Sequence, residues 1–73
     1  MRLRIEIASV PDRDAVVAEI WQNDEMVAEV QRDTGNGCKL EIYPNRKSEA
    51  WAFDLQEWLA VLLEAQRRLK ERD

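Results

Sequence analysis

The side chains that could carry chemistry in this sequence are carboxylates, one thiol and a glycine-rich loop. The chain of 73 residues contains no histidine, so the commonest general base and metal ligand is missing. Cys38 therefore has no histidine to activate it. Because it follows Gly37 at the start of an expected strand, we expect a small packed or edge residue, or an intermolecular contact, rather than a nucleophile. A single cysteine also excludes an internal disulfide and fits a reducing compartment.

Paired carboxylates could serve glycoside hydrolysis or bind a hard cation. The candidates are Asp12 with Asp14, Asp24 with Glu25, and the set Glu19, Glu29 and Glu41. Catalysis also needs a concave, partly dry site, and a domain of this size offers little interior for one. The Asp12–Asp14 segment is too short for a calcium loop, and the glycines at 35 and 37 precede a strand rather than a helix, unlike a phosphate-binding loop. We expect no enzyme, no bound metal and no cofactor.

Five alternating segments precede one helical segment. Alternation of apolar and polar side chains predicts strands at about 2–8, 15–21, 26–32, 38–43 and 50–53. The loop at 34–37 contains the glycines and asparagine whose positive φ tight hairpins require. The expected fold class is α+β: an antiparallel meander of four to five strands with one face packed on a single C-terminal helix, in the order β-β-β-β-β-α, forming one domain over residues 1–73.

The start of the helix has a clear capping signal. Asp54 is a good N-cap, Glu57 is placed to reach back to the cap's amide, and Phe53 and Trp58 occupy the positions of a hydrophobic staple. The predicted helix spans about 55–71. Its apolar arc covers roughly 200°, about twice what one sheet face needs. The surplus around Trp58, Val61 and Leu63 predicts a homodimer, which would also help a chain too small to bury a large core.

The apolar faces of neighbouring strands must match, and this constrains their register. On this basis Ile20 is expected to pair with Ala28, and Ala18 with Val30. In the same way Ala28 is expected to pair with Ile42, and Val30 with Leu40. Leu40 and Ile42 are expected to face the core. The first of these registers needs an odd loop, such as one formed by residues 23–25.

The same registers predict the composition of the opposite sheet face. They align Glu19, Glu29 and Glu41 in one row, which Arg4 or Glu6 extends on the first strand. A second row beside it contains Trp21, Val27 and Tyr43. Like charges directly opposite each other on a sheet are destabilising by roughly 0.2–1 kcal/mol per pair. The functional hypothesis is that these two rows bind a basic partner, with the aromatic side chains as anchors. The partner-binding residues would be Glu19, Glu29, Glu41, Trp21, Val27 and Tyr43. The alternative is that the glutamates extend into water and the aromatic side chains shield the sheet edge.

Composition and charge narrow the class of partner. Hydrophobic residues make up 45% and charged residues 36% of the chain, as in a globular domain. The net charge is −4; residues 1–36 carry eight acidic and four basic side chains, and the rest carries seven of each. This balance disfavours nucleic acid and anionic membranes. No apolar run is long enough to span a bilayer or form a signal peptide, so we expect a cytoplasmic protein.

A second function class rests on a resemblance. Strands followed by a long C-terminal helix are also the topology of the whirly and positive-cofactor-type single-stranded-DNA binders. Residues 50–59 resemble their final strand, acidic cap and tryptophan-bearing helix. The resemblance implies DNA binding through basic and aromatic residues of the sheet. The cations that could contact phosphate are Arg2, Arg4, Lys39, Arg46 and Lys47.

The leading hypothesis is a small non-catalytic protein-interaction module. It would act as an inhibitor or immunity-type protein. Some such proteins mimic the charge of nucleic acid, as anti-restriction and anti-CRISPR proteins do. The alternative is a single-stranded nucleic-acid-binding protein.

Overall fold

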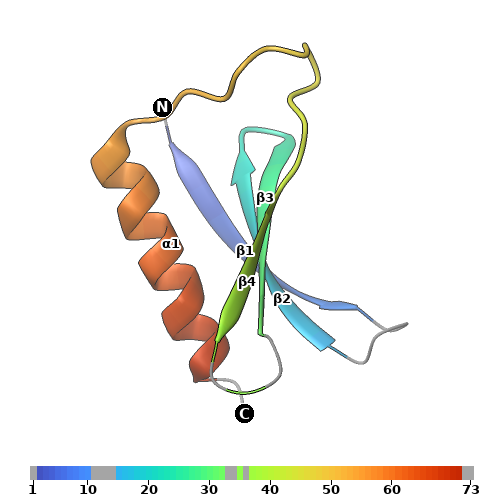
Figure 1. The fold of residues 1–73 in the computed structure, drawn as a ribbon, viewed down its shortest axis with the longest axis vertical. Coiled ribbons are helices and arrows are strands. Elements are labelled where there is room, and N and C mark those ends of the chain that lie inside the picture. The colour runs from blue at the N-terminus through green and yellow to red at the C-terminus, as the bar shows by residue number, and fades with distance from the viewer. Residues whose placement is uncertain (1, 11–14, 33–34, 36, 72–73) are drawn as a thin grey trace.

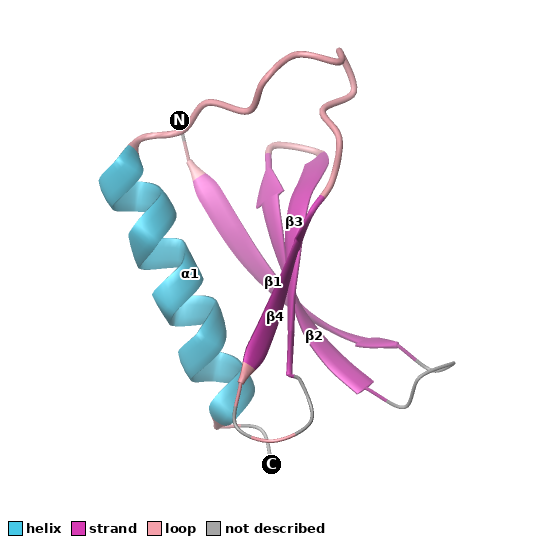
Figure 2. Cartoon of the chain, in the orientation of Figure 1, coloured by secondary structure: helices cyan, strands magenta, loops and turns pink. Residues whose placement is uncertain are grey.

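The protein has a four-stranded antiparallel sheet followed by one helix. The computed structural model describes residues 2–10, 15–32, 35 and 37–71. The strands are β1 (Leu3–Val10), β2 (Ala15–Gln22), β3 (Glu25–Arg32) and β4 (Cys38–Ile42), and the helix is α1 (Leu55–Lys70). Figure 1 shows α1 lying along one face of the twisted sheet, and Figure 2 shows the long loop that connects β4 to it. The predicted α+β class, the meander and the C-terminal helix are confirmed.

The strands lie in the order β1-β2-β3-β4, and each is antiparallel to its neighbour. All four predicted apolar pairs are present, namely Ile20 with Ala28, Ala18 with Val30, Ala28 with Ile42 and Val30 with Leu40. Alternation therefore fixed the register of β2, β3 and β4, because a slip of one residue would have moved every apolar side chain to the other face.

The turn between β2 and β3 differs from the prediction. It contains only Asn23 and Asp24, and Asn23 adopts a φ of 56°, a conformation that asparagine tolerates well. The register shifts between Ile20 and Trp21 instead, so that Trp21 pairs with Met26. A β-bulge thus supplies the extra residue that the sequence had suggested for the loop.

The predicted fifth strand is absent from the described residues. Residues 50–53 have no strand partner. The indole Nε1 of Trp51 donates a hydrogen bond to the carbonyl oxygen of Tyr43, at 2.7 Å. Trp51 stacks on Phe53 with ring centroids 5.5 Å apart, and Phe53 stacks on Trp58 at 5.1 Å. The alternation of large and small side chains in this segment therefore serves aromatic stacking above the helix start, and the predicted staple of Phe53 and Trp58 is formed.

The helix begins at the predicted cap. The carboxylate of Asp54 accepts a hydrogen bond from the amide of Glu57, at 2.9 Å. The carboxylate of Glu57 makes a different contact from the one predicted: it accepts from the amide of Leu3, at 2.7 Å. Glu57 thus joins the start of the helix to the start of β1.

The core lies between α1 and the first three strands, which are the strands it contacts most. Its buried members are Ala18, Ile20, Val27, Ala28, Val30, Val61, Ala65 and Leu69. The helix does not cover β4 to the same extent, and Leu40 and Ile42 remain 41% and 56% exposed. The prediction that these two residues face the core is therefore right for the side of the sheet and wrong for their burial.

Candidate interaction site on the sheet

A row of glutamates crosses all four strands on the sheet face opposite α1. Glu6 pairs with Glu19, Glu19 with Glu29, and Glu29 with Glu41. The three predicted carboxylates are therefore neighbours, and the register of β1 adds Glu6 rather than Arg4 as the fourth. We call these four residues the acidic row. Side chains directly opposite in an antiparallel sheet have Cβ atoms about 4.5–5.5 Å apart, so the like charges are close.

Hydrogen bonds from side chains two positions along the same strand, or on the neighbouring strand, hold members of the acidic row in place. The indole Nε1 of Trp21 donates to Glu19 Oε1 at 3.1 Å. The amide Nε2 of Gln31 donates to Glu29 Oε1 at 2.8 Å and also to Glu41 Oε1. The donors to Glu19 and Glu41 are neutral groups, so they orient these carboxylates without cancelling their charge.

The four carboxylates differ in exposure. Glu29 is only 7% exposed, and it accepts a further hydrogen bond from the hydroxyl of Tyr43 at 3.3 Å. A buried charge is tolerated only when it is hydrogen-bonded, so Glu29 is a structural member of the acidic row. Glu19 and Glu41 are half-buried and Glu6 is exposed. These three are the members that a partner can contact.

The predicted second row is only partly present. Trp21 and Tyr43 both donate to the acidic row and are half-buried beside it. Val27 is fully buried and belongs to the core. Because of the bulge, Trp21 pairs with Met26 and not with Val27. The predicted alignment of Trp21 with Val27 is therefore wrong, and Val27 presents no surface to a partner.

Arg4 closes one end of the site. Its guanidinium lies 5.2 Å from the centre of the Trp21 ring, a distance at which a cation is attracted to the ring face. Its Nε donates to Glu6 Oε2 at 2.7 Å and its Nη1 donates to the carbonyl of Asn23 at 2.6 Å. Arg4 therefore compensates the charge of Glu6 within the chain.

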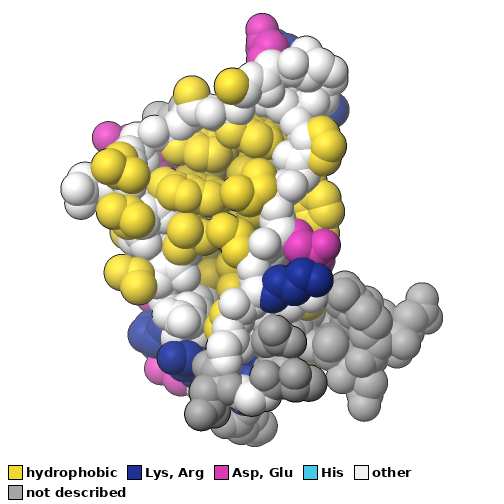
Figure 3. Space-filling view, viewed as in Figure 1, with side chains coloured by type: hydrophobic (Ala, Val, Ile, Leu, Met, Phe, Trp, Pro, Cys, Tyr) yellow, Lys and Arg dark blue, Asp and Glu magenta, His cyan; other side chains and the backbone are white. Residues whose placement is uncertain are grey.

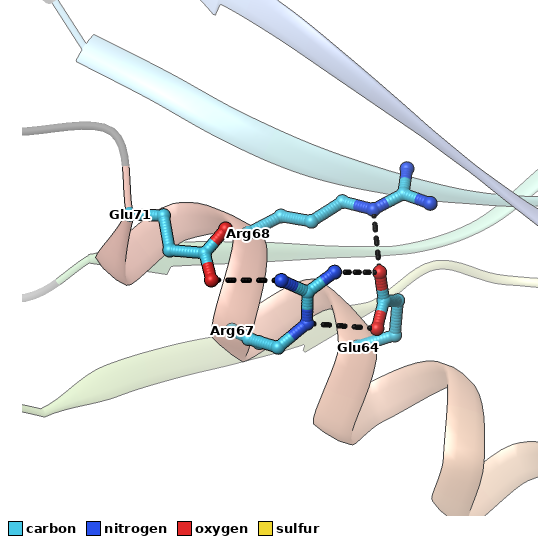
Figure 4. Close-up of polar contacts among 4 residues, drawn as sticks. All are labelled: Glu64, Arg67, Arg68 and Glu71. Carbon is cyan, nitrogen blue, oxygen red and sulfur yellow. Dashed lines mark hydrogen bonds and ion pairs between the residues drawn. The ribbon is translucent and has the colours of Figure 1, made fainter.

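A second cluster of charges lies at the end of the helix, where the carboxylate of Glu64 contacts two arginines (Figure 4). The guanidinium of Arg67 lies 2.5 Å from Glu64 and 2.7 Å from Glu71, and that of Arg68 lies 2.9 Å from Glu64. The hydrogen bonds from Arg67, and then from Arg68, lower the pKa of Glu64 to about 2. The helix thus neutralises these charges internally, in addition to the favourable position of the arginines at its C-terminal end.

An apolar groove separates α1 from β4 on the other side of the sheet, and Figure 3 shows hydrophobic side chains gathered there. It holds about 180 Å³ of space and is lined by Val30, Cys38, Lys39, Leu40, Leu62, Leu63 and Gln66. Of the three residues predicted for self-association, Leu63 is 66% exposed in this groove, Trp58 is half-buried against Phe53, and Val61 is buried in the core. Leu55 and Leu59, which the sequence interpretation did not single out, are 65% and 46% exposed.

Other candidate chemistry is limited. Cys38 is half-buried against the core, and its thiol is free. Within the described ranges, no group of three or more cysteine and acidic side chains is arranged to hold a metal ion. Asp24 lies 3.0 Å from the guanidinium of Arg46, which also contacts Glu25. The pair Asp12 and Asp14 lies outside the described residues. In the described part of the chain, no helix has the length and apolar character to cross a membrane.

Comparison of the chain with protein-family models, with curated proteins and with solved structures gave no match. The class of protein is therefore defined by its fold and its surfaces: a small α+β domain with an acidic row on one sheet face and an apolar groove on the other.

Proposed function

We propose that this protein is a small, non-catalytic, cytoplasmic interaction module that binds a partner with a basic surface through the acidic row. It would act as an inhibitor or immunity-type protein, and a partner that normally binds nucleic acid is the class that such a charged surface would block. Glu6, Glu19 and Glu41 would contact the basic groups of the partner, while Trp21 and Tyr43 would provide apolar contact area.

The observation that carries the proposal is the direct pairing of four glutamates on the face opposite the helix. Each like-charge pair costs roughly 0.2–1 kcal/mol in a sheet. The hydrogen bonds from Trp21 and Gln31 hold Glu19 and Glu41 in place without neutralising them. An arrangement that costs stability and is nevertheless held in position is best explained by a role outside the folded chain.

Binding of single-stranded nucleic acid is the alternative, and the composition of this face argues against it. Such binding uses a positively charged groove with stacking aromatic side chains. The sheet face opposite α1 carries the acidic row, with Arg4 already paired to Glu6. The stacked aromatic side chains of Trp51, Phe53 and Trp58 lie beside the helix start instead.

The proposal also includes self-association as a homodimer. The sequence indicated Trp58, Val61 and Leu63 as the surface. Because Val61 is buried in the core, the dimer surface would instead be formed by the exposed leucines of the groove. Leu63 belongs both to this surface and to the one that the sequence indicated.

The test uses the immobilised protein to capture partners from a lysate of the source cell, followed by titration of the purified partner at several salt concentrations. The variant Glu19→Gln/Glu41→Gln removes two charges and keeps an oxygen that can accept from Trp21 and Gln31. Glu29 is left unchanged because it is buried. We expect the variant to bind at least about tenfold more weakly, because each lost contact in water contributes on the order of 1 kcal/mol.

The matched control is Glu49→Gln/Glu71→Gln, which removes the same charge at exposed positions away from the acidic row. It should bind as the wild type does. Equal binding by wild type and the acidic-row variant, with no response to salt, would contradict the proposal. Fluorescence anisotropy with a labelled single-stranded oligonucleotide tests the alternative, and binding at micromolar concentration or tighter would reverse the ranking.

A further inference from the structure

Among the strands that the structure describes, β4 forms the edge of the sheet beside the apolar groove, and half of its backbone groups have no partner strand. β4 is the last strand in the order β1-β2-β3-β4. The amide of Tyr43 donates to the carbonyl of Val27 on β3, at 2.9 Å. Because backbone groups alternate in direction along an antiparallel strand, those of Glu41 and Lys39 also point to β3. The amides and carbonyls of Cys38, Leu40 and Ile42 therefore point away from the sheet.

The side chains of β4 are self-complementary about Leu40. In an antiparallel pair of two β4 strands centred on this residue, Leu40 lies opposite its own copy, and Cys38 lies opposite the partner's Ile42. These are the residues with free backbone groups, so the pair is joined by about six hydrogen bonds. On the other face, Lys39 lies opposite the partner's Glu41, and symmetry makes this ion pair occur twice. Charge, backbone direction and apolar side chains thus favour the same register.

The groove is the second part of the surface. Leu40 and Ile42 are 41% and 56% exposed, and Leu59 and Leu63 on the helix are 46% and 66% exposed. These four residues lie on the sheet side that carries α1, so the pairing of two β4 strands brings both grooves together. Contiguous exposed apolar side chains next to a free strand edge are typical of an association surface.

We infer that a second copy of this chain docks on this side of the molecule, with β4 antiparallel to the partner's β4 about Leu40 and the two grooves facing each other. The inference rests on the self-association proposed above, and it gives that association a geometry. Of the acidic row, only Glu41 takes part in it.

The other free edge, β1, is less suited to this role. Its residues Arg4 and Glu6 could also pair across a two-fold axis, but they already contact each other within the chain at 2.7 Å. The amide of Leu3 at its start is occupied by Glu57. The groove beside β1 is lined partly by Glu57, Glu64 and Arg68, which are charged groups that a dry interface would have to desolvate.

The experiment is a charge exchange measured by sedimentation velocity from micromolar to millimolar concentration. Lys39→Glu places like charges opposite each other at both pairs, and so does Glu41→Lys. The double variant Lys39→Glu/Glu41→Lys restores both pairs with reversed sign. We expect each single variant to weaken the dimer roughly tenfold or more, and the double variant to recover most of the loss. Lys39 is exposed in the single chain, so its replacement leaves the fold intact, which circular dichroism will verify.

A second pair of variants examines the groove. Leu63→Glu places a charge in the interface and should abolish the dimer, while Ala60→Glu places the same charge on the exposed surface of the same helix and should not. A wild type that stays monomeric at every concentration would contradict self-association altogether. A dimer that is lost with Leu63→Glu but is unaffected by both single charge variants would contradict the β4 pairing and leave self-association intact. A dimer that is weakened by Arg4→Glu and not by Lys39→Glu would contradict the β4 pairing in the same way.

Discussion

The position of α1 on the sheet can be tested with two leucines of the helix, Leu63 and Leu69. Leu69 is fully buried, whereas Leu63 is 66% exposed, and the two side chains lie about 120° apart around the helix axis. Replacing a buried leucine with alanine costs about 2–5 kcal/mol, which includes the cavity left behind. Since Leu69 lies in the last turn, where neighbours can partly close the gap, we expect about 3 kcal/mol for Leu69→Ala. For Leu63→Ala we expect less than about 0.5 kcal/mol at low protein concentration.

The loss expected for Leu69→Ala is large for this chain. Stabilities of about 0.05–0.15 kcal/mol per residue give about 4–11 kcal/mol for a domain of this size. Urea unfolding, followed by tryptophan fluorescence and far-UV circular dichroism at low micromolar concentration, measures both variants against the wild type. Equal costs for the two substitutions, or a larger cost for Leu63→Ala, would show that the helix presents a different face to the sheet.

Three further predictions follow from local contacts. Asp54→Ala removes the cap of α1 and should lower the free energy of unfolding by about 1 kcal/mol in urea denaturation. The pKa of Glu64 is lowered from 4.5 to about 2 by hydrogen bonds from Arg67 and Arg68. The stabilising contribution of Glu64 is therefore complete above about pH 4.5 and is lost as the pH falls to about 2. Glu64→Gln should flatten the acid limb when the free energy of unfolding is measured as a function of pH. Gly35 has a φ of 94° with open space around it, so Gly35→Ala should cost about 1 kcal/mol through the backbone alone, whereas Gly37→Ala, which meets no neighbour either, should be close to neutral in the same assay.

Strand register could be predicted because the positions of β2, β3 and β4 that face the helix carry apolar side chains at every second residue. The same pattern correctly predicts that Glu19, Glu29 and Glu41 lie opposite one another. The turn at Asn23 and Asp24 could not be predicted in the same way. The register of β2 and β3 requires one residue more than a two-residue turn provides. The chain supplies this residue with a bulge instead of a longer loop. A bulge leaves little trace in a two-state pattern of apolar and polar residues.

The burial of individual side chains was harder to predict than the register. Val27 alternates as an outward-facing residue but is fully buried, because the bulge interrupts the alternation beside it. Leu40 and Ile42 alternate as core residues but remain exposed, because one helix does not cover four strands equally. Trp51 and Phe53 have the spacing of a strand, yet they stack in a loop. Alternation reports which side of a surface a residue lies on, and tertiary packing decides what covers it.

The wide apolar arc of α1 is explained by two separate surfaces on one helix. Val61 and Leu69 are buried against the sheet, whereas Leu63 lines the groove beside β4 and Leu59 is 46% exposed. Polar residues in the groove would cost the isolated chain little and would improve its solubility, so stability of the monomer does not account for the leucines there. β4 also carries Glu41, which is the last member of the acidic row. In the inferred dimer the partner's Lys39 lies beside that carboxylate and partly neutralises it, while Glu6 and Glu19 are distant from the pairing edge. Dimer formation and binding of a basic partner are therefore expected to oppose each other through Glu41, and by linkage the opposition must act equally in both directions.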